Sequence, residues 1–216
     1  MLIKALCDYS RIQEKEVQDG YCKQNVNYLI QLSPEGCIDN IISVEESKPI
    51  KNKNGKEKMV LAPKVAELPV RTQKPGIDGN IIEHRPLYIF GLNYNKKDGT
   101  LSTEDKTDKA KKSHKAFCEV NLAFFEGIDS PLCRAYCNFI KTWKPEEHTS
   151  DPILLGLGSR FGAASGYYEF GFDTDKLLQD DPAFREAYDK YLAEKQAAAE
   201  AENTELAVCS ILGERL

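Results

Sequence analysis

The sequence predicts an α+β domain with a mainly antiparallel sheet and with its helices grouped in the second half. Three observations carry this prediction. Before Thr107, short apolar runs alternate with polar residues, as in half-buried strands. Turn-forming Gly, Pro, Asn and Asp residues separate these runs. After Thr107, apolar residues recur every three or four positions, which is the period of an amphipathic helix. Strands followed by helices are typical of the α+β class.

The N-terminal half should begin with a short amphipathic helix over residues 2–10 and continue into a β-hairpin over 26–44. In the first strand of the hairpin, Val26, Tyr28, Ile30 and Leu32 recur at every second position, as in a half-buried strand. Residues 33–36, with the sequence SPEG, form the turn. The second strand then runs back over residues 37–44.

The next segments carry less regular patterns. Residues 47–58 are basic and have no hydrophobic period, so they predict a loop. Residues 59–61 predict a short strand. Residues 64–86 contain several prolines and glycines, which favours a second long loop. Residues 87–92 are almost all apolar, which predicts a central strand.

In the second half, the pattern predicts helices near 107–126, 131–143 and 182–197. Ser130-Pro131 and Asp181-Pro182 supply an N-cap residue followed by a proline at the first helical position. Between these helices we expect a short extended piece at 153–157, a flexible glycine-containing loop over 156–162, and a strand over 167–172. The Ala- and Glu-rich residues 196–203 should fray into a linker.

Composition points to an ordinary soluble protein that we expect in the cytoplasm. The chain has 216 residues, of which 41% are hydrophobic and 29% are charged. It has no apolar run of membrane-spanning length and no signal-peptide pattern at its start. Its seven cysteines are an odd number without a dense framework, which favours reduced thiols.

Charge is segregated along the chain although the net charge is only -5. Residues 48–74 hold eight basic and two acidic residues, 95–116 hold seven lysines and four acidic residues, and 173–205 hold ten acidic and four basic residues. A local basic patch can bind phosphates even on an acidic protein. The alternative is that these lysines only solvate long loops.

No residue pattern predicts a metal, a cofactor or a catalytic centre. Cys133 and Cys137 lie four residues apart, near Cys118 and His148 in sequence, and a zinc site is one interpretation of this set. The chain has no C-x-x-C pair, however, and helical cysteines at this spacing usually pack in a core. His114 is expected to face solvent or a partner. We therefore expect a protein that is not an enzyme.

Several short stretches, in order, carry a resemblance to a known family. They are LIKALCDY (2–9), MVLAP (59–63), GIDGN (76–80), YIFG (88–91), DK (108–109), HKAF (114–117), FIKTWKPE (139–146) and CSILGE (209–214). Together they resemble the N-terminal domain of the large subunit of the type I-C CRISPR Cascade. Members of that family are much longer, so residues 1–204 would be the DNA-recognition domain and 205–216 the start of a further region.

The resemblance implies that the protein recognises the short protospacer-adjacent motif (PAM) on double-stranded DNA and starts unwinding. Guide RNA in the crRNA-containing Cascade subunits then reads the remaining sequence by base pairing. A recruited nuclease-helicase would cut the target, and no membrane is involved.

The residues implied for this task lie in the basic segment and the loop that follows it. We assign Gln73 and Asn80 to base contact, because amide side chains both donate and accept at base edges. We assign Lys64, Arg71, Lys74, Lys53 and Lys56 to phosphate contact. The loop departs from the family at Asp78-Gly79, where a Lys-Pro is usual, and at Ile81, where an aromatic residue is usual.

Three alternatives remain open at this point. Asn80 could merely stabilise its own turn, as Asn often does. The whole domain could dock on sibling subunits or RNA without reading DNA. A metal-dependent enzyme is the third reading of the chain.

Overall fold

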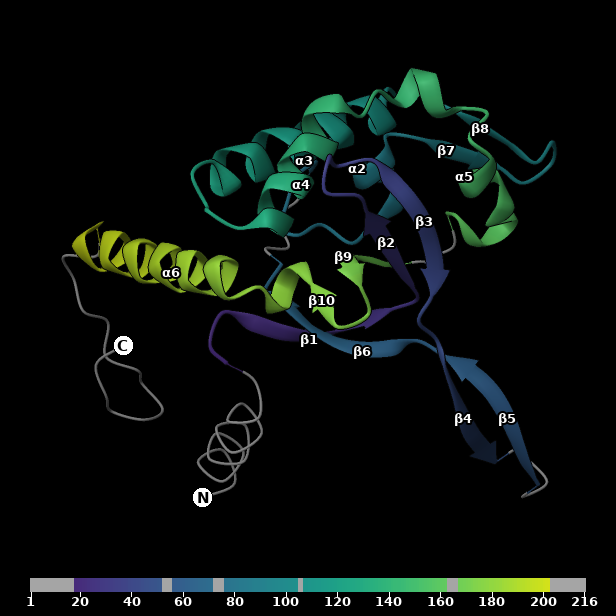
Figure 1. Cartoon of the computed structure of the whole chain (residues 1–216), viewed down its shortest axis with the longest axis horizontal. Helices are drawn as coiled ribbons and strands as arrows, with labels where there is room; N and C mark the ends of the chain where they lie inside the picture. Colours follow the sequence, from purple (N-terminus) through teal and green to yellow (C-terminus); the bar gives the residue numbers. More distant parts are fainter. Residues whose placement is uncertain (1–17, 52–55, 72–75, 105–106, 163–166, 203–216) are drawn as a thin grey trace.

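The computed structural model describes residues 18–51, 56–71, 76–104, 107–162 and 167–202 of the chain. It confirms the α+β class, the mainly antiparallel sheets and the grouping of helices in the second half (Figure 1). The expected helix at 2–10 and the region 205–216 lie outside the described residues.

A four-stranded sheet with the order β10-β9-β2-β3 forms the centre of the fold. Strands β2 (Tyr28–Leu32) and β3 (Ile38–Ser43) pair in antiparallel register, so the predicted 26–44 hairpin is confirmed. Strand β9 (Tyr168–Asp173), also predicted, lies parallel to β2 on its other side. Strand β10 (Lys176–Leu177) completes the sheet beside β9.

Three antiparallel pairs complete the strand content of the described residues. They are β1 (Tyr21–Val26) with β6 (Lys64–Pro69), β4 (Glu46–Lys51) with β5 (Glu57–Ala62), and β7 (Asn93–Asn95) with β8 (Thr100–Ser102). The prediction of a loop was therefore wrong for residues 47–51 and 57–58, and for residues 64–69 of the predicted loop 64–86, whereas residues 76–85 form a loop as predicted. Strand β4 has no alternation of apolar and polar residues, because most of its residues are exposed on both faces and only a half-buried strand shows that alternation.

The three predicted helices are confirmed as α3 (Lys109–Phe125), α4 (Pro131–Thr142) and α6 (Pro182–Glu202). The Ser130 side chain accepts hydrogen bonds from two backbone amides in the first turn of α4, as its cap position predicts. The expected fraying over 196–203 was wrong up to Glu202, because α6 continues to that residue. Alanine, frequent in this stretch, has the highest helix propensity.

Two short helices replace predicted extended segments. Residues 87–92 are not a central strand: α2 (Pro86–Phe90) begins with its proline and ends at Gly91, which has a φ of 65°. Proline at the start and left-handed glycine after the end are helix-boundary signals, and a fully apolar run does not separate strand from buried helix. Likewise, residues 153–156 of the expected extended piece belong to α5 (Pro152–Gly156), whose first amides are capped by Asp151.

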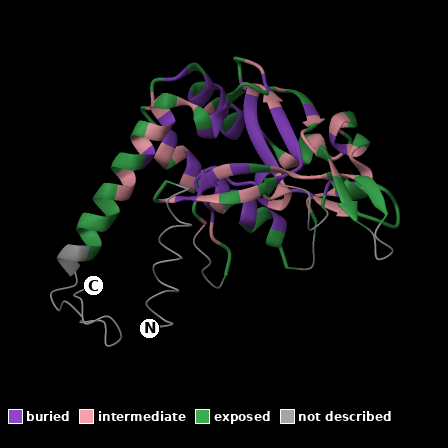
Figure 2. Ribbon diagram, turned by 90° about the horizontal axis from the view of Figure 1, so that it is seen from below, coloured by how far each residue is buried: buried purple, intermediate pink, exposed green. Residues whose placement is uncertain are grey.

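The core lies where α4 packs against β2 and β9. Aromatic rings fill it: the Tyr136 ring meets Phe170 at 4.8 Å and Phe125 at 4.8 Å, and the Phe90 ring meets Tyr168 at 5.3 Å. Figure 2 shows the buried residues gathered here, whereas the C-terminal half of α6 is exposed. Aromatic rings bury large apolar areas, and the burial of such surface favours folding.

The remaining segments connect these elements. Three single turns of 3-10 helix occur at η1 (Pro145–His148), η2 (Gly158–Arg160) and η3 (Leu178–Asp180), so part of the expected 156–162 loop is helical. Within the described ranges, no helix combines the length and the apolar character that crossing a membrane requires.

Candidate nucleic-acid interface

The β4–β5 hairpin projects from the body of the protein (Figure 1) and carries much of the basic segment. The strand register places Lys48 opposite Val60 and Ile50 opposite Lys58. Since side chains alternate across a strand, Lys48 and Lys58 lie on the same face. Lys51, Lys56 and Lys58 are exposed. Lys56 lies at the tip end of the hairpin, and Lys53 is outside the described residues.

Lys64, a predicted phosphate contact, has a partner inside the protein. Its Nζ lies 3.1 Å from Oε1 of Glu169, a side chain with no exposed surface. The other oxygen of Glu169 accepts a 2.7 Å hydrogen bond from Gln179. A buried carboxylate needs such partners, so contact with a phosphate would compete with an internal ion pair that joins β6 to β9.

Arg71 is half-buried and contacts His84. Its Nη1 lies 3.3 Å from His84 Nε2. Burial lowers the pKa of His84 to about 4, with the charge of Glu83 opposing that shift and Arg71 adding to it. The imidazole is therefore neutral at pH 7 and accepts the hydrogen bond from the guanidinium. This contact fixes the position of Arg71 just before the reading loop, which is the loop that carries Gln73 and Asn80, the residues predicted to contact bases.

Asn80 is buried, with 7% of its surface exposed. Its side-chain amide donates to Glu83 Oε2 over 3.2 Å, and its backbone carbonyl accepts from the Asn121 side chain over 3.0 Å. In this conformation Asn80 stabilises its own turn, which was the alternative to base contact. Reaching a base edge would require this loop to move.

Glu83 is the centre of a buried polar cluster that holds the loop. Its carboxylate accepts from Nε and Nη2 of Arg85 and from the backbone amides of His84 and Arg85. Burial opposes ionisation, yet the hydrogen bonds and charge of Arg85 hold the pKa of Glu83 below its usual value. Asn121 accepts from the Ile82 amide and from the Tyr136 hydroxyl. The loop is thus fixed to α3 and α4.

Glycine allows this close approach of loop and helix. A Cβ atom added at Gly79 would lie 2.4 Å from the carbonyl oxygen of Ala116 in α3. By contrast, Gly76 and Ile77 are exposed. Gln73, the other residue predicted to contact bases, and Lys74, a predicted phosphate contact, lie outside the described residues.

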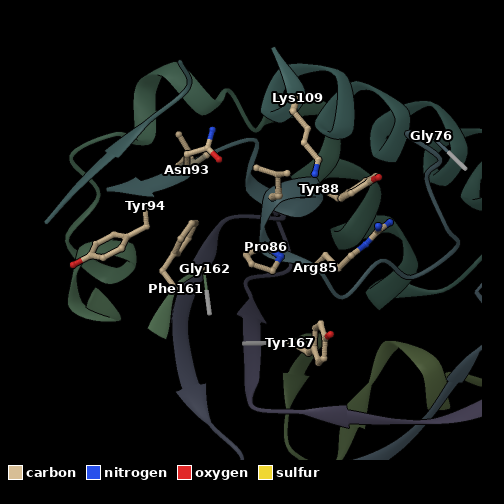
Figure 3. Close-up of a pocket in the computed structure, with 12 residues that line it drawn as sticks. Gly76, Arg85, Pro86, Tyr88, Asn93, Tyr94, Lys109, Phe161, Gly162 and Tyr167 are labelled. Atoms are coloured by element: carbon tan, nitrogen blue, oxygen red, sulfur yellow. The ribbon is translucent and has the colours of Figure 1, made fainter. Parts of the chain in front are cut away.

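Gly76 borders a pocket that the sequence did not single out (Figure 3). Arg85, Tyr88 and Lys109 also line it. Lys109 belongs to the lysine-rich stretch 95–116, which was the one available signal. Arg85 carried no such signal, because the walls of the pocket come from segments far apart in the sequence, around Arg85, Lys109 and Phe161.

The residues considered for zinc do not meet as a ligand set. Within the described ranges, no three His, Cys, Asp or Glu side chains cluster in a way that would hold a metal. Burial raises the pKa of Cys133 to about 12 and that of Cys118 to about 11, so both thiols are protonated in this structure. His148 stacks on Trp143 at 3.7 Å and contacts Asp151.

His114 corrects another expectation. It is buried rather than directed to solvent, with 9% of its surface exposed. Its Nδ1 lies 2.9 Å from the carbonyl oxygen of Tyr88, and burial lowers its pKa. His114 therefore joins α3 to α2 as a neutral side chain.

Comparison with known proteins supplies the family. No individual curated protein matches the chain. Residues 6–216 match the family described as CRISPR-associated protein (Cas_Csd1), which is nearly the whole chain. The protein therefore belongs to the Cas_Csd1 family of CRISPR-associated proteins.

Proposed function

We propose that this protein is the part of the type I-C Cascade large subunit that recognises the protospacer-adjacent motif on double-stranded DNA and helps to start unwinding. The observation that supports this most is the projecting basic hairpin, with exposed Lys51, Lys56 and Lys58. The major groove of DNA admits a two-stranded β-ribbon, and lysines bind phosphates.

In this proposal the loop after the hairpin reads the motif. Gln73 and Asn80 contact bases, and Lys64, Arg71, Lys74, Lys53 and Lys56 contact phosphates. Because Asn80 and Lys64 have internal partners, their contact with DNA requires exchange of those partners. The fixed polar cluster around Glu83 gives the loop a firm base from which its exposed end can approach DNA.

The protein itself makes no covalent change to DNA in this proposal. The crRNA-containing Cascade subunits supply base pairing, and a recruited nuclease-helicase cuts the target. This division of tasks needs no cofactor and no catalytic residue in the chain, and it operates in the cytoplasm.

The test is binding of the assembled complex to duplexes that carry every variant of the motif. Asn80→Ala and Gln73→Ala should each weaken binding to the correct motif by about 1–3 kcal/mol and reduce its margin over mismatched motifs. Lys74→Ala should weaken binding to all duplexes alike. Because Asn80 is buried, its variant also needs a measurement of unfolding free energy. An intact motif preference in Asn80→Ala, together with a changed one in Lys74→Ala, would contradict the assignment.

A second candidate function is docking on sibling Cascade subunits without DNA reading. One face of the same hairpin favours it: Pro49 pairs with Met59 and Ser47 with Leu61, and Met59 and Leu61 are 58% and 66% exposed. Exposed apolar surface of this kind often marks a protein contact. Leu61→Lys should then prevent association with sibling subunits, whereas Lys58→Ala, on the opposite face, should not.

A further inference from the structure

The pocket beside the reading loop has the dimensions of a small-molecule site. Its volume is about 490 Å³, within the range of about 300–1,000 Å³ that is typical of ligand pockets. It opens between α2, the strand β7 and the segment around Phe161, and Gly76 lies at its edge. Figure 3 shows its walls.

Among the described residues, two cations and no carboxylate line this pocket. Arg85 reaches it from the start of α2, and Lys109 from the first residue of α3. Figure 3 shows Lys109 directed towards Tyr88. Arg85 binds Glu83 through Nε and Nη2, so Nη1 lies outside that ion pair. The lining therefore favours an anionic group.

Aromatic rings form the other walls. Tyr94, Phe161 and Tyr167 line the pocket together with Tyr88, and Figure 3 shows Tyr94, Tyr88 and Tyr167 on different sides of it. The Arg85 guanidinium already stacks on the Tyr88 ring at 3.6 Å. Tyr94 and Tyr167 are half-buried, so each keeps part of its surface open to a ligand.

A ligand with a flat ring and an attached anionic group matches this lining, because the ring can stack on the aromatic side chains and the anion can bind the cations. Bases stack on aromatic side chains with little regard to sequence, and lysine and arginine bind phosphate. A base within a duplex is stacked on both faces and must leave the helix to enter a pocket. The pocket is thus suited to a nucleotide that is already unpaired.

We propose that this pocket binds one unpaired nucleotide, with its phosphate at Lys109 and Arg85 and its base against the tyrosine rings. The inference rests on the proposed function, because strand separation next to the motif produces such a nucleotide. It assigns the first unpaired position of the opened DNA to a defined place beside the exposed end of the reading loop.

The test compares the binding of two labelled DNAs to the full chain, by fluorescence anisotropy. One is a blunt duplex, and the other is the same duplex with a short unpaired stretch in one strand. The wild-type chain should bind the second roughly tenfold more tightly, the scale of one stacked base. Tyr94→Ala and Lys109→Ala should each remove this preference.

Two matched controls separate the pocket from general effects. Tyr94→Phe keeps the ring and should keep the preference. Lys111→Ala removes an exposed lysine of the same helix α3 that does not line the pocket, and should also keep it. Lys109 is exposed, so Lys109→Ala remains informative if Tyr94→Ala fails to fold. The proposal is overturned if the preference survives both pocket substitutions, or if Lys111→Ala removes it equally.

A competition experiment distinguishes a strand from a free nucleotide. A deoxynucleoside monophosphate should displace the unpaired DNA only at much higher concentration than unlabelled DNA of the same kind. Equal competition per mole would assign the pocket to free nucleotides and overturn the proposal. Motif-dependent binding by the assembled complex, measured in parallel, shows whether the proposed function fails independently of the pocket.

Discussion

His84 is a buried histidine in the loop that carries the predicted readers, and its neutrality affects stability. Its folded pKa is about 4, against about 6.5 in the unfolded chain. Between these values the unfolded state binds the extra proton, so the free energy of unfolding falls as pH drops from about 6.5 to about 4.

We expect this histidine to account for up to about 3 kcal/mol of the decrease in stability across that range. His84→Gln keeps an acceptor for Arg71 but does not titrate. The difference in unfolding free energy between wild type and His84→Gln, measured by urea denaturation, should shrink as pH falls from 6.5 to 4. Parallel pH curves would show that His84 is not buried in its neutral form.

Substitution of Lys64 tests whether this residue stabilises the fold or contacts DNA. Lys64→Ala leaves the buried Glu169 with Gln179 alone, which we expect to cost about 2–3 kcal/mol of unfolding free energy. The double variant Lys64→Ala/Glu169→Gln should regain part of this loss. Lys48→Ala, which breaks an exposed pair with Glu46, should change stability by less than about 1 kcal/mol. If Lys64→Ala weakens only DNA binding, its role is with phosphate.

At the scale of residues, the sequence indicated what a side chain can bind but not which residues surround it in the fold. Amide chemistry made Asn80 a candidate reader, yet its burial depends on Asn121, which lies 41 positions away. Lys64 was one of eight basic residues in a segment, and nothing local indicated that Glu169 would pair with it. Such long-range partners are set by the tertiary fold, which a local pattern does not contain.

At the scale of elements, a hydrogen bond joins the N-cap residues of the two helices α4 and α6. Ser130 caps α4 and donates a 2.5 Å hydrogen bond to Asp181. Asp181 in turn accepts from the backbone amides of Ala183 and Phe184 at the start of α6. One hydrogen bond therefore couples the first turns of two helices that lie far apart in the chain.

Ser130→Ala and Asp181→Ala should each lower the unfolding free energy by about 1 kcal/mol. Because the two side chains share a hydrogen bond, the double variant should cost less than the sum of the single variants, by about 0.5 kcal/mol or more. Urea denaturation of the four proteins measures this coupling. Asp151→Ala removes the cap of α5 and is the control. Its loss of unfolding free energy should add to that of Ser130→Ala, because the two caps share no hydrogen bond. Additive losses at Ser130 and Asp181 would contradict the link.

Helices with clear caps and a long period were predictable, and short elements were not. Ser130-Pro131 and Asp181-Pro182 predicted α4 and α6, and Asp151-Pro152 carries the same signal for α5. That helix spans only 5 residues, too few to display a helical period. Strand β4 was missed because a projecting hairpin has no buried face to impose alternation.

The distribution of charge matters at the scale of the whole molecule. The acidic residues gather towards α6, whereas the hairpin is basic, and Figure 1 shows these two elements projecting from different parts of the body. A net charge of -5 provides no overall attraction to DNA. Any affinity of the isolated chain must come from local contacts, and it should be micromolar or poorer.

This separation allows a test with two variants of equal net charge. Replacing Lys51, Lys56 and Lys58 by alanine removes three exposed lysines of the hairpin. Replacing Lys176, Lys190 and Lys195 removes three exposed lysines from the acidic part of the chain. Only the hairpin variant should weaken duplex binding and flatten its dependence on salt, by about 0.9 in the logarithmic slope for each phosphate that is no longer neutralised. The measurement is the dissociation constant over a series of salt concentrations. Equal weakening in both variants would mean that overall charge, rather than the hairpin, governs binding.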